Sequence, residues 1–199
     1  FYFDCNCWIL FMEKNLKQTP SNCLKVVLFG PESSGKTTLS RELSNHYKTS
    51  WVKEYAREYL QEKWDSVNKI CELKDIIPIA QGQIKLENER SLNASKLLFC
   101  DTDLLETKVY SEMYFNDYCD PQLEKYALEN HYDLYLLTDI DIPWVKDDLR
   151  DRPNNRMEMF LAFKKTLIKY KKPYVIVSGN LENRIKIAVF EIDKLLPKN

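Results

Sequence analysis

The sequence "LKVVLFGPESSGKTTLSREL", residues 24–43, joins three local patterns in order. An apolar run typical of a buried strand leads into a turn bounded by Gly30 and Gly35, and the segment after the turn has helical spacing. Backbone N–H groups in such a turn can surround phosphates, and the N-terminal end of a helix dipole favours an anion. A chance match would not bring strand, turn and helix together in this order. The stretch predicts a phosphate-binding loop (P-loop) for a nucleoside triphosphate.

Two side chains of this loop have expected roles in phosphoryl chemistry. Lys36 should reach the β- and γ-phosphates, and the Thr37 hydroxyl should ligate Mg²⁺. Kinases, GTPases and motor ATPases all share such a loop, so the chemistry must be read from the residues that follow. The residues expected to contact ATP in the loop are Gly30, Glu32, Ser33, Ser34, Gly35, Lys36, Thr37 and Thr38.

The composition is that of an ordinary globular chain. With 199 residues, 44% hydrophobic and 30% charged, the chain is long enough for one domain with a substantial core. A net charge of −1 argues against broad attraction to nucleic acid or to an anionic membrane, and no apolar run is long enough to span a bilayer. Six scattered cysteines and two histidines lack zinc-site spacing, which favours a reduced cytoplasmic protein.

The N-terminal region is expected to lie apart from the domain. Residues 1–11 have no basic stretch and no small-residue cleavage site, so they make a poor signal peptide, and Met12 is the expected natural start. The prediction is an extension over residues 1–22 outside the fold and a P-loop kinase domain over 23–199. The alternative for residues 1–11 is an edge strand or a short packing helix.

Apolar runs alternate with helical segments along the rest of the chain. The runs cover residues 24–30, 50–55, 96–101, 132–139 and 172–179, and the second is amphipathic like an edge strand. Helical spacing is found at 37–47, 79–94, 103–115, 121–130, 156–170 and 181–195. This alternation predicts an α/β fold of the P-loop NTPase/kinase type, with three layers and a doubly wound, mostly parallel five-stranded sheet.

Acidic residues follow two of the predicted strands. In "FCDTD", Asp101 ends an apolar strand at the carboxyl edge of the sheet, where it could bind Mg²⁺ or accept the proton of an attacking hydroxyl. Asp103 could share that site or cap the next helix. Glu54 ends the second strand and has Arg57 as a close neighbour on the following helix, a pair suited to sugar hydroxyls and phosphate. A surface salt-bridge cluster is the alternative for that pair.

Residues 141–156, "DIPWVKDDLRDRPNNR", carry three arginines after the fourth strand. A mobile segment bearing Arg150, Arg152 and Arg156 could close over the γ-phosphate, exclude water and neutralise the charge of the transition state. A plain solvated loop is the alternative. Gly179, in "VSGN" after the fifth strand, could let the backbone approach the adenine or could belong to an ordinary turn.

Several of these motifs together resemble the ribosylnicotinamide kinase module of NadR-type proteins. The matching pieces are "GPESSGKTTL", "EYAREYL", "IAQGQ" (79–83), "FCDTDLLET" and "PWVKDDLRD", in the same order and at similar spacing. The resemblance implies transfer of a phosphoryl group from ATP, with Mg²⁺, to the 5′-hydroxyl of nicotinamide riboside. NAD contains the nicotinamide ribose unit and could occupy the same pocket.

The resemblance also implies roles for individual residues. Lys36, Asp101, Arg150 and Arg156 would serve catalysis, and Thr37 and Asp101 the metal. One departure is Lys53, which stands where the family often has an aromatic residue. The riboside would be bound by Glu54, Tyr55, Arg57, Asp103, Trp144, Asp147 and Asp148. A kinase for another nucleoside and a nucleotide-binding ATPase or sensor remain the alternative functions, and the oligomeric state is not predicted.

Overall fold

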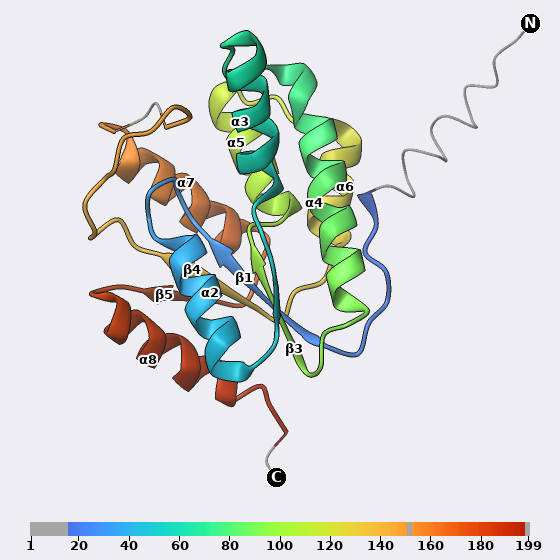
Figure 1. The fold of residues 1–199 in the computed structure, drawn as a ribbon, viewed down its shortest axis with the longest axis vertical. Coiled ribbons are helices and arrows are strands. Elements are labelled where there is room, and N and C mark those ends of the chain that lie inside the picture. The colour runs from blue at the N-terminus through green and yellow to red at the C-terminus, as the bar shows by residue number, and fades with distance from the viewer. Residues whose placement is uncertain (1–15, 151–152, 198–199) are drawn as a thin grey trace, which may run out of the picture.

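A five-stranded parallel sheet forms the centre of the protein (Figure 1). The structure is a computed structural model and describes residues 16–150 and 153–197. The strands pair in the order β2-β3-β1-β4-β5, and every pairing is parallel, which confirms the predicted fold class. The strands are β1 (Leu24–Phe29), β2 (Ser50–Val52), β3 (Leu97–Asp101), β4 (Leu134–Thr138) and β5 (Tyr174–Val177).

Helices cover both faces of the sheet and create one apolar core on each (Figure 1). Along β1, Val27 and Phe29 pack into the core beneath α4–α7, whereas Val26 and Leu28 pack into the core beneath α2 and α8. Both faces of β1 are therefore buried, which explains its continuous apolar sequence. The helices are α2 (Lys36–Tyr47), α3 (Tyr55–Val67), α4 (Ile76–Ser91), α5 (Leu104–Tyr114), α6 (Pro121–Glu129), α7 (Arg156–Lys169) and α8 (Leu181–Asp193), with a short 3-10 helix, η1 (Leu73–Asp75).

Most predicted elements agree with these bounds to within a few residues, but the second strand ends at Val52 and not at residue 55, because α3 begins at Tyr55. Helix α4 begins at Ile76, three residues before the start inferred from the sequence. Pro78 does not interrupt the helix, because it lies in the first turn, where a helix needs no N–H donor. The amphipathic second strand is an edge strand as expected.

The domain begins earlier than the sequence suggested. Leu16 is fully buried in the core beneath α4–α7, and Gln18 donates hydrogen bonds to Glu87 and to the backbone of His131. The expected boundary at residue 22 is thus wrong for residues 16–19, because an apolar anchor and long-range hydrogen bonds attach them to the domain. The expectation for residues 1–15 falls outside the described residues.

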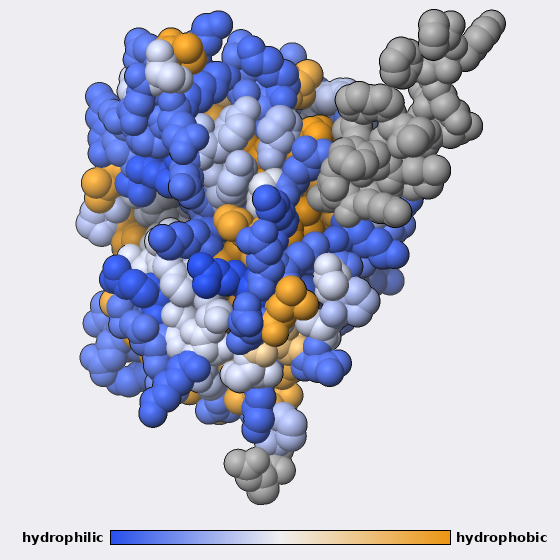
Figure 2. Space-filling model, turned by 45° about the vertical axis from the view of Figure 1, so that its right-hand side comes forward, coloured by the Kyte–Doolittle hydropathy of each residue, from blue (hydrophilic) through white to orange (hydrophobic). Residues whose placement is uncertain are grey.

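Most of the face drawn in Figure 2 is hydrophilic, in keeping with the two interior cores. Over residues 16–150 and 153–197, no helix has the length and apolar character needed to cross a membrane.

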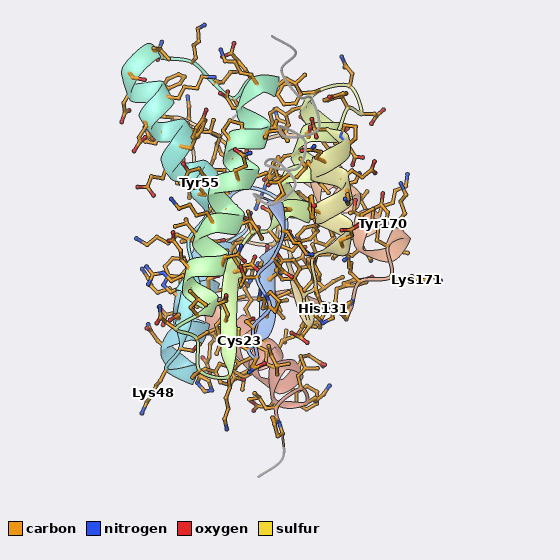
Figure 3. The ribbon with its side chains drawn as sticks, turned by 90° about the vertical axis from the view of Figure 1, so that its right-hand side faces the viewer. Cys23, Lys48, Tyr55, His131, Tyr170 and Lys171 are labelled. Carbon is orange, nitrogen blue, oxygen red and sulfur yellow. The ribbon has the colours of Figure 1, made fainter. Side chains whose placement is uncertain are left out.

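Helix α3 packs on α4 through a close contact between Tyr55 and Gly82, and Figure 3 shows Tyr55 between these helices. A Cβ added to Gly82 would lie 2.0 Å from the Tyr55 ring. Next to it, Gln83 accepts a hydrogen bond from the Tyr55 N–H (2.7 Å) and donates one to the Lys53 carbonyl (3.3 Å). The motifs "EYAREYL" and "IAQGQ" therefore form one packing unit that fixes α3 beside the end of β2.

We predict that Gly82→Ala destabilises the protein, although the same change inside a helix normally stabilises by up to about 1 kcal/mol. Displacing the Tyr55 ring should cost about 1–3 kcal/mol. We therefore expect the free energy of unfolding, measured with urea, to fall by about 1 kcal/mol or more. In a Tyr55→Ala background, Gly82→Ala should be neutral or stabilising because the overlap is gone. A Gly82→Ala protein as stable as the wild type would contradict this packing.

Candidate active site

The loop between β1 and α2 lies at the carboxyl edge of the sheet, close to β3 and β4. The register pairs Leu28 of β1 with Asp101 of β3, and the backbone of Gly30 passes beside Thr138 of β4. Gly30 and Gly35 have positive φ angles of 140° and 88°, and a Cβ on Gly30 would lie 2.7 Å from the Thr138 hydroxyl oxygen. Glycine is needed at these two positions to form the turn predicted from the sequence.

Arg184 of α8 supports the loop from behind, a role that sequence analysis missed. Its buried guanidinium donates to the carbonyls of Ser34 (2.6 Å), Gly179 (2.9 Å) and Asp139 (2.9 Å), and it pairs with Asp141. The Gly179 N–H donates to Asp141 (2.5 Å), so the turn after β5 is bound to the same support. No sequence pattern marks an arginine in the first turn of a helix as a partner of a loop 150 residues earlier in the chain.

Lys36 is the buried cation of the site. Its Nζ donates to the carbonyls of Gly30 (2.7 Å) and Pro31 (3.1 Å) and lies 3.1 Å from Oε1 of Glu106. Burial acts to lower the Lys36 pKa, but the carboxylates of Glu106, Glu54 and Asp101 outweigh it and raise that pKa. The ammonium is therefore held charged at the loop.

Glu106 is a second residue that sequence analysis missed. It stands at the third position of α5, three residues after the helix cap, where such a glutamate would be expected to reach back to that cap. Its side chain instead crosses to the loop and is only 2% exposed. Oε2 accepts a hydrogen bond from the Gly30 N–H at 3.3 Å.

Thr37 and Asp101 come together as predicted for a metal pair. The exposed Thr37 hydroxyl donates to Oδ2 of Asp101 at 2.5 Å, whereas the buried Oδ1 has no hydrogen-bond partner within the described residues. Burial, with Glu54 acting in the same direction and Lys36 opposing, raises the pKa of Asp101 to about 7.

The chemistry of this pair fits Mg²⁺, which binds through one or two protein oxygens while phosphates and waters complete its shell. The unpartnered Oδ1 of Asp101 is an oxygen acceptor of the required kind. Across residues 16–150 and 153–197 no cluster of three or more His, Cys, Asp or Glu side chains is arranged to hold a metal ion. A Mg²⁺ held mainly by phosphate oxygens needs no such cluster.

Asp103 has a structural position, in contrast to its predicted contact with substrate. Its Oδ1 caps α5 by accepting from the Glu106 N–H (2.9 Å), and its Oδ2 accepts from the Tyr135 hydroxyl (2.8 Å). The side chain is fully buried, and burial raises its pKa to about 7. The capping alternative is the one that the geometry supports.

A cavity of about 250 Å³ extends from the loop to the space between α3, α4 and α5. Lys36 and Thr37 line one end, and Glu54, Arg57 and Glu106 also contribute to the wall. The apolar residues on the wall include Leu60, Ile76, Ile79, Tyr110, Tyr114 and Phe115. Tyr55 does not line the cavity, because its ring is packed on Gly82, so its predicted contact with substrate is not supported.

The segment after β4 is docked on the loop and on α3. Asp147 accepts from Arg57 of α3 (2.6 Å) and lies 3.1 Å from Nε of Arg150, which in turn lines the cavity. Asp148 accepts from Gln61 (3.3 Å). Burial raises the Asp147 pKa, but Arg57 and Arg150 outweigh it and lower that pKa. Asp147 and Asp148 thus bind protein groups, contrary to their predicted contact with substrate.

The other predicted residues of this segment are near the loop but away from the cavity. Arg156 begins α7 and donates to the carbonyls of Ile142 (2.9 Å) and Ser33 (3.2 Å). Trp144 is half-buried and does not line the cavity, which argues against its predicted substrate contact. Arg152 falls outside the described residues.

Comparisons with known proteins agree with this geometry. The protein family described as "AAA domain" matches residues 25–184. The "Trifunctional NAD biosynthesis/regulator protein NadR" of Salmonella typhimurium is 31% identical over 125 residues, covering 63% of this chain and 30% of that protein. The chain therefore spans less than a third of the length of this curated relative.

Solved structures of kinases share the fold. "NadR protein in complex with NR" superposes with a TM-score of 0.70 at 23% identity, over 87% of this chain and 50% of that one. The same protein with NAD and AMP-PNP gives 0.71 at 23% identity, over 89% and 51%. Thymidylate kinase of Ehrlichia chaffeensis gives 0.61 at 13% identity, over 89% and 100%. These identities show the fold alone; with the match over residues 25–184, the chain belongs to the AAA domain family and is a P-loop kinase domain similar to NadR.

Proposed function

We propose that the chain transfers the γ-phosphoryl group of ATP to the 5′-hydroxyl of nicotinamide riboside, giving nicotinamide mononucleotide and ADP. The observation that carries this proposal is one continuous cavity that joins the P-loop to a compartment with aliphatic and aromatic walls. Such a shape suits a triphosphate next to a nucleoside with a flat ring. The choice of nicotinamide riboside is supported by the shared motifs and by the similarity to NadR, whose structure has been solved with NR.

In an in-line transfer, catalysis depends mainly on positioning and on charge neutralisation, and the residues around the cavity would have separate roles in these two effects. Thr37 and Asp101 would hold Mg²⁺, which when bound neutralises phosphate charge. Lys36 would bind phosphate oxygens. Glu54 lines the cavity and is suited to accept the proton of the acceptor hydroxyl. Asp101 is less suited to that role, because it already accepts a hydrogen bond from the Thr37 hydroxyl.

The docked segment 141–150 would exclude water from the transfer, with Arg150 supplying positive charge at the cavity and Arg156 bracing the loop. NAD is proposed as a further ligand of the same cavity, in line with the NadR structure that holds NAD.

A kinase for another nucleoside or nucleotide is the second candidate, because thymidylate kinase has the same fold. We expect Mg·ATP with nicotinamide riboside to release ADP in a coupled assay, and adenosine, uridine, thymidine or no acceptor to release little. A preference for another nucleoside would keep the transfer mechanism and replace the substrate. ADP release independent of the acceptor, or none despite ATP binding, would favour the ATPase or sensor alternative.

We predict that Lys36→Ala lowers the turnover by about 100-fold or more, because a buried phosphate ligand in a low-dielectric site is lost. Its melting temperature should stay close to that of the wild type, since Glu106 can be neutralised by a proton. Lys85→Ala removes an exposed lysine on α4 and serves as the control, with unchanged turnover. Near-normal turnover of Lys36→Ala would refute the assignment of the phosphate site.

The pKa of Asp101, raised to about 7, predicts a pH dependence. Below that pH the carboxyl is protonated and cannot bind a cation, so kcat/KM should fall as the pH drops from 8 to 6. Because Mg²⁺ competes with the proton for the same oxygens, higher Mg²⁺ concentration should move this acidic limb to lower pH. If the pH at which kcat/KM falls did not change with the Mg²⁺ concentration, that result would argue against Asp101 as the metal ligand.

A further inference from the structure

Glu106 is the ion-pair partner of the P-loop lysine, Lys36. Its Oε1 lies 3.1 Å from Nζ of Lys36, while Oε2 accepts a hydrogen bond from the Gly30 N–H. Both oxygens face positive or N–H groups, which is the arrangement of an ionised carboxylate. Oε1 lacks a hydrogen bond of regular geometry within the described residues, so its contact with Lys36 is electrostatic. The side chain also forms part of the cavity wall.

Negative charge is in excess around this pair. Glu54 faces it from the start of α3, and Asp103 lies one turn before it at the cap of α5. Asp101 reaches the same lysine from the end of β3. The phenol of Tyr110 lies in the field of Glu106 from the next turn of α5.

Three further carboxyl groups thus act on this one ion pair. Nucleotide phosphates that approach Lys36 would add still more negative charge beside Glu106.

We propose that Glu106 takes up a proton when nucleotide phosphates reach Lys36, so that Glu106 is a positioning residue whose charge follows the occupancy of the loop. The proton comes from solvent and bonds to a carboxylate oxygen, the charge of the side chain changes from −1 to 0, and the proton leaves when the nucleotide departs. This inference rests on the ATP-binding part of the proposed function.

The neighbouring carboxyl groups are less suited to that proton. Asp103 already accepts from two donors, the Glu106 N–H and the Tyr135 hydroxyl. Asp101 has the Thr37 hydroxyl as its donor, and a bound cation would favour its ionised form. Glu106 has one long hydrogen bond and one ion pair, and the ion pair is with the group that the phosphates would engage.

The electrostatics of Glu106 agree with this geometry. Burial raises the pKa of Glu106 well above its usual range, Lys36 opposes the shift, and Glu54 adds to it. Phosphates that neutralise Lys36 would weaken the one large opposing influence. In the free loop the ionised Glu106 keeps Lys36 at the Gly30 and Pro31 carbonyls, and in the complex the neutral side chain would not compete with phosphate for the ammonium.

The test is calorimetric titration with Mg·AMP-PNP at pH 7, 8 and 9, in buffers that differ in ionisation enthalpy. The wild type is compared with Glu106→Gln, which imitates the protonated side chain and keeps an acceptor for the Gly30 N–H. Glu129→Gln, a change at an exposed glutamate of α6, is the matched control. Glu106→Asp restores an ionisable group. The phosphates of the probe contribute equally to all four proteins.

At one or more of these pH values we expect the wild type and Glu129→Gln to bind up to about one proton more per nucleotide than Glu106→Gln. Their affinity should fall with rising pH by up to about tenfold per unit relative to Glu106→Gln, and Glu106→Asp should regain part of the proton uptake.

Equal proton uptake in the wild type and Glu106→Gln at every pH would overturn the inference. So would the absence of proton uptake by the wild type at all three pH values, a result that needs no variant to fold. If the wild type did not bind the probe, the proposed function would fail together with this inference, whereas binding without the proton difference would leave the proposed function intact.

Discussion

The charge on Lys36 is the constraint on which the carboxyl edge of the sheet depends. This one buried ammonium faces Glu106, Glu54 and Asp101, and all three act on its pKa. Removing like charges from water at such close range is costly unless a cation or a proton compensates them. Burial, with Glu54 acting in the same direction, raises the pKa values of Asp101 and Glu106, and the charge of Lys36 opposes this only in part. Under the proposed function, such a site would receive Mg²⁺ and a proton along with the nucleotide.

The loop around Lys36 is held from several distant parts of the chain. Arg184 of α8 binds its backbone at Ser34, Thr138 of β4 contacts Ser34 through a 2.6 Å hydroxyl contact, and Arg156 of α7 binds Ser33. These contacts are largely buried, so they fix the backbone before any ligand arrives. Because this loop is already ordered, little of the free energy of ligand binding is lost in ordering it, which is the main advantage of preorganisation.

The sequence predicted what depends on local patterns and missed what depends on distant neighbours. The strand, turn and helix at 24–43 were predicted because their signals are adjacent in sequence. Asp101 was expected at the carboxyl edge near the phosphate-binding loop because parallel strands end at one edge of a sheet, and its hydrogen bond with Thr37 agrees with that position. Arg184 and Glu106 carried no such signal, since each meets the loop only through tertiary packing.

Two expected substrate contacts that the geometry does not support have the same cause. Tyr55 and Asp103 stand next to cavity residues in sequence, yet a helix turn or a cap directs each side chain to a protein partner. Tyr55 packs on Gly82, and Asp103 binds the Tyr135 hydroxyl. Adjacency in a motif indicates the region of the site, but the rotation of the helix and the position of its cap determine which side chain reaches the cavity.

Phosphate chemistry and acceptor choice occupy different parts of this cavity. Lys36 and Thr37 begin α2 directly after the phosphate-binding loop, whereas Leu60, Ile79 and Tyr110 belong to helices α3, α4 and α5. Substitutions in those helices can therefore change the accepted ring without disturbing the loop. The loop chemistry therefore says little about the acceptor, which in the proposed function the apolar wall and Glu54 would select.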